Sequence, residues 1–380
     1  MLNSALYGLV QAASVFYKTM KDFSINEMSF VMCISDTCIF VKGNIILGLY
    51  VDDILIVGRT DVVEEFTVNM QKRFACRVDM NVDEFIGCQM FWSQDKNKVV
   101  LHQQRMIGNL ENKIKNLIIG YKIKSSSTPF LKGTGIEKRK DDEECMNPGD
   151  QKIYRSTVGA LLYLTKHSRP DLCNSIRELS KVNKVGTEEH FICLLRVCNW
   201  LFENKNYGVE LKRSKDENCS WNLEAFSDSD WENCKDSRRS ITGYIVFLNR
   251  NPISWGSRSQ KVVSLASAHS EYTAVTEVRK EVLYMKILMF FLNVKPDLPI
   301  TIHCDNSGAI FLSNNQESKK SKHLDTKVHF IRNYTEKGII KVIYVSGDKN
   351  YADSFTKSVS KSIMDQNQDY MTPLSGFSDV

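Results

Sequence analysis

The sequence lacks the cysteine pairs that would indicate a zinc site or a disulfide framework. Its 11 cysteines are scattered, their number is odd, and none forms a Cys-x-x-Cys pair. No stretch approaches the ~18 consecutive apolar residues of a membrane span. No basic segment precedes a short apolar core at the amino terminus, which argues against a secretory leader. These absences predict an intracellular chain in a reducing compartment, without a membrane partner.

The sequence also lacks a large excess of charge of either sign. Its 50 Lys and Arg residues face 45 Asp and Glu residues, so the formal net charge is +5. This mildly basic balance permits a polyanionic partner such as nucleic acid but does not require one. A chain of 380 residues, 42% of them hydrophobic, is globular and too long for one ordinary core. We therefore expect two or three domains.

Two adjacent acidic residues, Asp52 and Asp53, interrupt an apolar stretch. The runs on either side, residues 45–49 and 54–57, are rich in β-branched residues and too short for helices, so they predict a β-hairpin with both carboxylates at its tip. Polymerases hold metal ions on such a hairpin. The alternative is an ordinary turn, because Asp is common in turns.

Hydrophobic periodicity and turn residues divide the chain into regions. Residues 1–125 alternate helices and strands, as expected of an α+β piece. Residues 126–220 begin with a linker rich in Ser, Pro and charge and continue as a helical connection. Residues 221–360 predict a meander of three strands followed by alternating helices and strands, which gives a mixed sheet covered by helices. The predicted fold class is therefore α/β, and residues 361–380 form a tail.

Four acidic residues occupy special positions in the last predicted domain. Asp228 is expected at the end of its first strand and Asp305 at the end of its fourth, where sites on α/β sheets are usually built. Glu271 begins the long helix predicted over residues 270–292, on the face of that helix which is buried. Asp353 comes three residues after Asn350, the expected cap of a short helix.

These four carboxylates could converge on a pair of divalent cations. Mg²⁺ prefers oxygen ligands, and two metals about 4 Å apart can activate a water and stabilise the leaving oxygen of a phosphodiester. The pattern thus predicts phosphodiester hydrolysis that depends on Mg²⁺ or Mn²⁺. The alternative is structural: the dipole favours acids in the first turn of a helix, and Asp is common in turns and caps.

A series of short motifs resembles, in order and spacing, the carboxyl-terminal part of the Pol polyprotein of copia-type long-terminal-repeat retrotransposons. The resemblance covers nearly the whole chain, and its specificity comes from the series rather than from any one motif. The motifs are Leu6-Tyr7-Gly8-Leu9-Val10-Gln11-Ala12, Tyr50-Val51-Asp52-Asp53, Ser127-Thr128-Pro129, Tyr154-Arg155-Ser156-Thr157-Val158-Gly159, Tyr163-Leu164, Arg169-Pro170-Asp171, Ser227-Asp228-Ser229-Asp230-Trp231, Arg239-Ser240-Ile241-Thr242-Gly243-Tyr244, Ile253-Ser254-Trp255, Ser270-Glu271-Tyr272, Cys304-Asp305-Asn306, Lys322-His323-Leu324-Asp325, His329-Phe330-Ile331-Arg332 and Ala352-Asp353-Ser354-Phe355-Thr356-Lys357.

The resemblance implies that residues 1–125 are the end of the palm and the thumb of a truncated reverse transcriptase, and residues 221–360 a ribonuclease H domain. The implied partner is an RNA–DNA hybrid, and the implied location is the cytoplasm, in a virus-like particle, or the nucleus. The implied metal ligands, with a catalytic role and Mg²⁺ or Mn²⁺ as cofactor, are Asp52 and Asp53 of the polymerase and Asp228, Glu271, Asp305 and Asp353 of the ribonuclease H.

The chain also departs from this family. The first catalytic Asp of the family precedes the Leu-Tyr-Gly-Leu segment, at which this sequence starts. A usual Lys is Val10, and a usual Pro-Arg is Ala13-Ser14, so contacts to phosphate are weakened. We therefore expect hydrolysis of RNA in hybrids without polymerase activity. A non-catalytic nucleic-acid-binding remnant, or a domesticated protein, is the alternative. An integrase is disfavoured because the polymerase hairpin precedes the domain.

Two observations concern histidine. His323 and His329 are not at the helical spacing of metal ligands, so we expect helix packing or substrate contact from them. Some ribonucleases H carry a mobile His that helps the product leave, but no His lies between Ser346 and Asp353. This predicts slow turnover.

Overall fold

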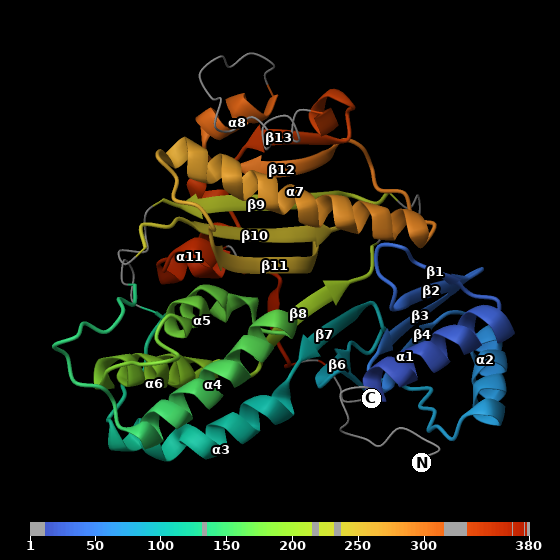
Figure 1. Ribbon diagram of the computed structural model, residues 1–380, viewed down its shortest axis with the longest axis horizontal. Helices are drawn as coiled ribbons and strands as arrows, with labels where there is room; N and C mark the ends of the chain where they lie inside the picture. The colour runs from blue at the N-terminus through green and yellow to red at the C-terminus, as the bar shows by residue number, and fades with distance from the viewer. Residues whose placement is uncertain are drawn as a thin grey trace. The chain divides into compact units, whose positions relative to one another are not determined.

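The computed structural model describes residues 12–130, 135–214, 220–231, 237–314, 333–366, 368–375 and 377 (Figure 1). It forms two compact units. One comprises Met1–Gly87 with Leu283–Lys295, and the other comprises Cys88–Val282 with Pro296–Val380. Among the described residues, no helix combines the length and the apolar character needed to cross a membrane. The Leu6–Leu9 segment, His323 and His329 lie outside the described residues.

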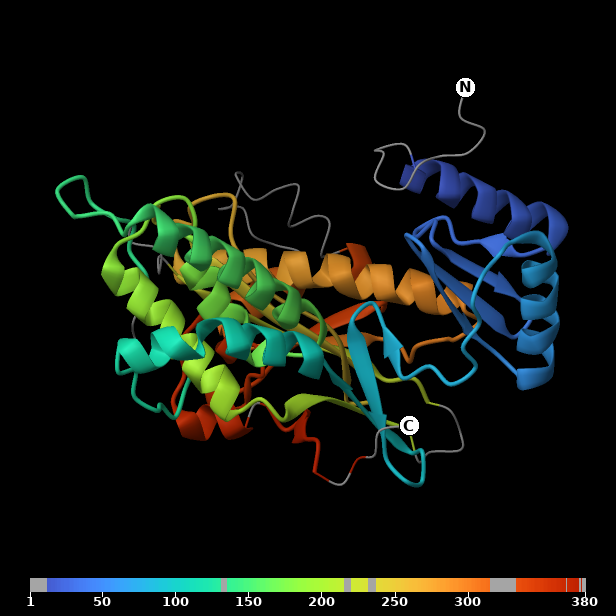
Figure 2. The ribbon, with the colours of Figure 1, turned by 90° about the horizontal axis from the view of Figure 1, so that it is seen from below.

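The first unit is built on a four-stranded antiparallel sheet in the order β1-β2-β3-β4. Alternate residues of β3, Ile45, Leu47 and Leu49, are buried, as expected for a strand with one face on a core. Aromatic residues such as Phe40 and Phe66 complete this core. Figure 2 shows the helices of this unit, in blue, lying beside its sheet. The elements are α1 (Ala12–Asp22), a π-helical turn (Phe23–Glu27), β1 (Val31–Met32), β2 (Ile39–Lys42), β3 (Ile45–Tyr50), β4 (Asp53–Val57), α2 (Thr60–Arg73) and β5 (Glu84–Phe85).

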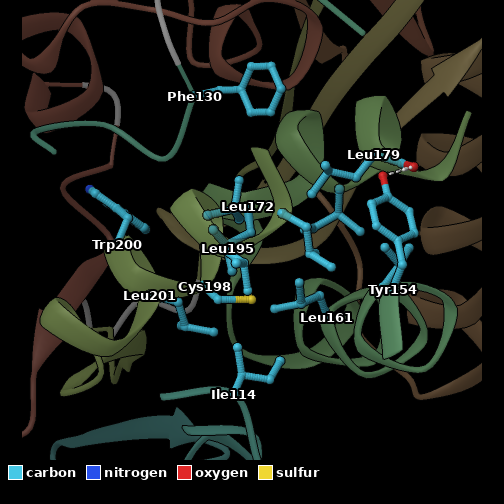
Figure 3. Close-up of a cluster of buried hydrophobic side chains, with 14 of the residues drawn as sticks. Ile114, Phe130, Tyr154, Leu161, Leu172, Leu179, Leu195, Cys198, Trp200 and Leu201 are labelled. Carbon is cyan, nitrogen blue, oxygen red and sulfur yellow. Dashed lines mark hydrogen bonds between the residues drawn. The ribbon is translucent and has the colours of Figure 1, made fainter. Parts of the chain in front are cut away.

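The second unit contains a helical connector with a core of its own. Tyr154, fully buried in this core, donates a hydrogen bond from its hydroxyl to the carbonyl of Leu179 at 2.7 Å (Figure 3). The connector consists of α3 (Gln104–Gly120), α4 (Pro148–His167), a 3₁₀ turn (Pro170–Leu172), α5 (Cys173–Ser180) and α6 (Glu188–Glu203). Pro170, which cannot continue a helix, begins the 3₁₀ turn between α4 and α5.

An antiparallel sheet beside these helices joins distant parts of the sequence. It contains β6 (Cys88–Trp92), β7 (Lys98–His102), β8 (Tyr207–Lys212) and β14 (Met371–Pro373). Met371 of β14 pairs with Val209 of β8. The segment predicted as a tail therefore contributes a helix, α11 (Lys361–Gln366), and a strand to the second unit.

The other sheet of this unit has the order β11-β10-β9-β12-β13. β9, β10 and β11 form the predicted antiparallel meander, while β12 runs parallel to both β9 and β13. Figure 1 shows α7 crossing one face of this sheet. The elements are β9 (Leu223–Asp230), β10 (Ile241–Leu248), β11 (Asn251–Ser259), α7 (Ser267–Phe291), β12 (Ile300–Cys304), α8 (Ser307–Asn314), β13 (Ile340–Tyr344), a 3₁₀ turn (Gly347–Lys349) and α10 (Asp353–Thr356). The part of α7 from Leu283 on belongs to the first unit.

Two local expectations were wrong. β9 continues to Asp230, so Asp228 lies inside this strand rather than at its end, because β10 pairs with β9 as far as Asp230. Asn350 does not cap α10, which begins at Asp353. The Asn350 side chain instead accepts a hydrogen bond from the amide of Ala352 at 3.1 Å and donates one to the carbonyl of Ser227 at 3.1 Å.

Candidate metal centre

The structure brings three of the predicted acids together at one edge of the mixed sheet. Carboxylate oxygens of Asp228, Asp305 and Asp353 all lie within 4.8 Å of one another. β9 and β12 pair in parallel, with His303 opposite Phe226. Asp305 and Asp228 each follow two residues later, so both acids reach the same edge of the sheet. The third acid starts α10.

The fourth acid, Glu271, reaches the same place from α7. One of its oxygens lies within 4.8 Å of ligand atoms of Cys304 and Asp305. Because Asp305 belongs to both groups, all four carboxylates surround one centre. Glu271 is 6% exposed and shares the buried face of α7 with Val275 and Val278, as predicted. Its role as a metal ligand, like that of the other three acids, stays a prediction.

Two buried oxygens in this centre lack a hydrogen-bond partner. They are Oε2 of Glu271 and Oδ1 of Asp353. A buried carboxylate oxygen without a partner carries a large desolvation cost, which a cation would offset. The donor set consists mainly of carboxylate oxygens, which suit Mg²⁺ and Mn²⁺. The residues present therefore fit a divalent metal.

Burial and neighbouring negative charge raise the pKa of three carboxyls of the centre. Burial, followed by the negative charges of Asp228 and Asp305, raises the pKa of Glu271 well above its usual range. Burial and Asp228 likewise raise the pKa of Asp353 and of Asp305. Without metal, the centre thus favours protonated carboxyls near neutral pH.

Lys357 and Thr356 complete the centre, although neither was predicted to have a role in it. The ammonium of Lys357 lies 3.0 Å from Oδ2 of Asp353 and 3.9 Å from Oδ2 of Asp228. Burial opposes the charge of Lys357, but these carboxylates outweigh it and raise its pKa. The Thr356 hydroxyl donates to Asp228. The spacing from Asp353 to Lys357, one helical turn, is the one signal that could have indicated this pair.

Cys304 also lies at the centre, where it was not predicted. It ends β12 and is fully buried, and its Sγ lies within 4.8 Å of oxygens of Glu271 and Asp305. Burial raises the pKa of its thiol, and the charge of Glu271 adds to this effect. A thiol next to an acid at a strand end has no distinct chemical pattern, so the motif Cys304-Asp305-Asn306 did not indicate that the thiol would lie at the centre.

The hairpin of the first unit presents Asp52 and Asp53 as predicted, and both are exposed. Asp53 begins β4 opposite Tyr50, and Val51 in the turn has φ = 49°. A β-branched residue rarely adopts a positive φ, so the turn is strained. Among the described residues, no third acid, His or Cys joins the two carboxylates in a group that could hold a metal.

The 380-residue chain, assayed by itself, is expected to show no templated DNA synthesis. Nucleotidyl transfer needs two metals clamped by carboxylates on both sides, and Asp52 and Asp53 supply only one side. Primer extension on a primed RNA template measures this. Incorporation above that of an Asp52→Asn, Asp53→Asn control would show the expectation to be wrong.

The metal-free protein is expected to lose stability as the pH rises from about 4, the ordinary carboxyl pKa. Since Glu271 and Asp353 have raised pKa values in the folded state, the folded chain holds protons that the unfolded chain releases. The stability that these two carboxyls contribute is fully present below their pKa in the unfolded chain. It is lost as the pH rises through their raised pKa values in the folded chain. Mg²⁺ at pH 8 should restore the lost stability.

The measurement is the melting temperature at pH 5 and pH 8, with EDTA or with Mg²⁺. The variant Asp353→Asn isolates the contribution of the centre from that of other titrating groups. It should show a smaller loss between the two pH values. Equal losses in wild type and variant would contradict the account.

Comparisons with known proteins agree with the motif series. Residues 1–125 match the family model described as reverse transcriptase (RNA-dependent DNA polymerase). The retrovirus-related Pol polyprotein from transposon RE1 of Arabidopsis thaliana is 33% identical over 95% of this chain and 24% of its own length. The corresponding polyprotein from transposon TNT 1-94 of Nicotiana tabacum is 28% identical over 95% of this chain and 27% of its own length.

Among solved structures, a ribonuclease H1 crystallised with an RNA/DNA hybrid, LC11-RNase H1, aligns with 35% of this chain and 92% of its own, at 12% identity and a TM-score of 0.26. The chain spans about a quarter of the length of the curated relatives named above. Residues 1–125 carry a reverse transcriptase domain, and the chain is homologous over 95% of its length to Pol polyproteins of copia-type retrotransposons.

Proposed function

We propose that the carboxylate centre hydrolyses the RNA strand of an RNA–DNA hybrid, with Mg²⁺ or Mn²⁺ as cofactor. The observation that supports this most is the convergence of Asp228, Glu271, Asp305 and Asp353 at one sheet edge. A cation bound at the centre would contact the buried carboxylate oxygens that lack hydrogen-bond partners. The relationship to retrotransposon Pol polyproteins supports the choice of substrate, because reverse transcription produces such hybrids.

The four carboxylates would hold the metal pair, which supplies an activated water and stabilises the charge on the leaving oxygen when bound. The chain's own residues fix this geometry. Thr356 holds Asp228 by its hydroxyl. Asn350 ties the loop before α10 to Ser227 of β9, so Asp353 stays next to Asp228. Lys357 neutralises two carboxylates and is half-exposed, so its ammonium can turn to the phosphate.

Selection of the hybrid would come from duplex shape and from contacts to 2′-hydroxyls rather than from base sequence. The net charge of +5 assists contact with phosphates in general but is too small to specify a duplex. We therefore expect little sequence preference. Without a His in the loop before α10, where Asp348 and Lys349 stand, turnover should be slow.

The test uses four end-labelled substrates: RNA paired with DNA, RNA paired with RNA, single-stranded RNA, and a DNA duplex. Each is incubated with Mg²⁺ or with EDTA. We expect the RNA strand of the hybrid to be cleaved and the other three substrates to stay intact. Cleavage should occur with Mg²⁺ and not with EDTA. Binding of the hybrid without any cut would show an inert nucleic-acid-binding remnant instead.

A further inference from the structure

The helical connector contacts the backbone next to the metal centre through one side chain. Arg177 of α5, which is 10% exposed in its side chain, donates from Nε to the hydroxyl of Ser257 in β11 at 2.8 Å. It also donates from Nη2 to the carbonyl of Thr356 at 3.2 Å. The second contact joins residues 179 positions apart in the sequence. Arg177 thus links the connector, the sheet and α10.

Thr356 is also the residue that holds a predicted metal ligand. Its hydroxyl donates to Asp228. Thr356 also packs closely against β10, since a Cβ added at Gly243 would lie 2.6 Å from the Thr356 methyl group. Thr356 therefore has little freedom to move toward the sheet. A second connector residue, Asn174, donates to the hydroxyl of Ser358 at 3.4 Å. The connector therefore contacts the chain on both sides of Lys357.

The guanidinium of Arg177 is itself held in place. Its Nη1 lies 2.8 Å from Oε1 of Glu178, which is almost fully buried. Glu178 also accepts from Lys181 at 2.8 Å and from the amide of Ile136 at 2.7 Å. A planar guanidinium presents its donors in a fixed geometry, so a guanidinium anchored on one side can orient the groups on its other side. Glu178 keeps two partners if Arg177 is replaced.

We propose that Arg177 is a positioning residue of the metal centre, through which the helical connector sets the place of Thr356 and hence of Asp228. The connector is then part of the catalytic unit and more than a spacer between domains. This inference rests on the proposed function. Residues that orient metal ligands from outside contribute about 10- to 100-fold to metal affinity or activity.

The test compares Arg177→Met with Trp255→Phe in the full chain. Trp255 donates from Nε1 to the carbonyl of Thr165 at 2.6 Å. This hydrogen bond also joins the sheet to the connector but does not involve the segment that holds the carboxylates, and phenylalanine removes it while keeping an aromatic ring in the cluster around Phe355. Calorimetric titration with Mn²⁺ should show affinity reduced about tenfold or more in Arg177→Met and unchanged in Trp255→Phe. For cleavage of the hybrid, kcat should fall in Arg177→Met at constant KM.

Equal loss of Mn²⁺ affinity in both variants, or no loss in Arg177→Met, would overturn the inference. If Arg177→Met does not fold, Thr356→Val and Thr356→Ser replace it: the valine should weaken Mn²⁺ binding and the serine, which keeps the hydroxyl, should restore it. Equal affinities in these two variants would also overturn it. Wild type that binds no Mn²⁺ would overturn the proposed function as well.

Discussion

Replacing Asp305 by Asn is expected to reduce cleavage of the hybrid by at least about 100-fold while the fold stays intact. Asp305 takes part in both groups of ligand atoms, so each group loses an anionic oxygen in this variant. Residues that merely orient a metal ligand already contribute about 10- to 100-fold, and a direct ligand should contribute no less. Asn has nearly the same shape, so no cavity opens.

The metal-free melting temperature of this variant should equal or exceed that of wild type. Burial and the charge of Asp228 raise the pKa of Asp305, which shows that its ionised form is disfavoured in the folded chain. A neutral amide removes this repulsion. Added Mg²⁺ should raise the melting temperature of wild type and have little effect on the variant.

Cleavage and melting are measured together, with and without Mg²⁺. The matched control is Asp365→Asn, which removes an exposed carboxylate of α11 paired with Lys361 at 2.6 Å. This control should cleave as wild type does. Full cleavage by Asp305→Asn would place the metal centre elsewhere.

The second large effect concerns stability, at the ion pair between Arg169 and Asp171. The Arg169 side chain is fully buried, and its Nη2 lies 2.6 Å from Oδ2 of Asp171, with Nε at 3.0 Å from Oδ1. It also donates to the carbonyl of Asn204 at 3.0 Å and packs over the ring of Trp200. This guanidinium holds the break between α4 and α5 against the end of α6.

Asp171→Ala is expected to lower the free energy of unfolding by about 3–5 kcal/mol, because it leaves a buried cation without its counter-charge. Urea unfolding followed by circular dichroism measures the loss. The matched control is Asp61→Ala. Arg59 and Asp61 have the same spacing and a 2.8 Å contact, but they are 75% and 61% exposed in their side chains.

An exposed pair contributes at most about 1 kcal/mol, so the control should unfold near wild type. If Asp171→Ala lowers the free energy of unfolding no more than Asp61→Ala does, the Arg169 side chain must find other partners or water. The structural role assigned to this ion pair would then be wrong. The expected result is that Asp171→Ala loses its helical signal at a lower urea concentration than wild type, while Asp61→Ala does not.

Features that depend on local sequence were predicted well. The hairpin around Asp52 and Asp53 follows from two short β-branched runs and a turn, and the burial of Glu271 follows from helical periodicity. The sequence of elements in the mixed sheet, a meander of three strands followed by alternating helices and strands, also agrees with the prediction. In each case the signal lies within a few neighbouring residues.

Features that depend on distant contacts were not predicted. β9 runs through Ser227 to Asp230, polar residues with low strand propensity, because its neighbour β10 pairs with it as far as Asp230. β14 is three residues long and forms only by pairing with β8. The contact between Arg177 and Thr356 crosses 179 positions. Such pairings leave no periodic signal in a single sequence.

The measurement that tests the central claim most directly is calorimetric titration of the chain with Mn²⁺ at pH 7, beside the double variant Asp228→Asn, Asp305→Asn. We predict binding by wild type with release of protons, because the carboxyls of the centre have raised pKa values and must ionise to bind metal. Titrations in buffers of different ionisation enthalpy reveal that release. The double variant should bind no Mn²⁺, and binding of equal strength by both proteins would contradict the account.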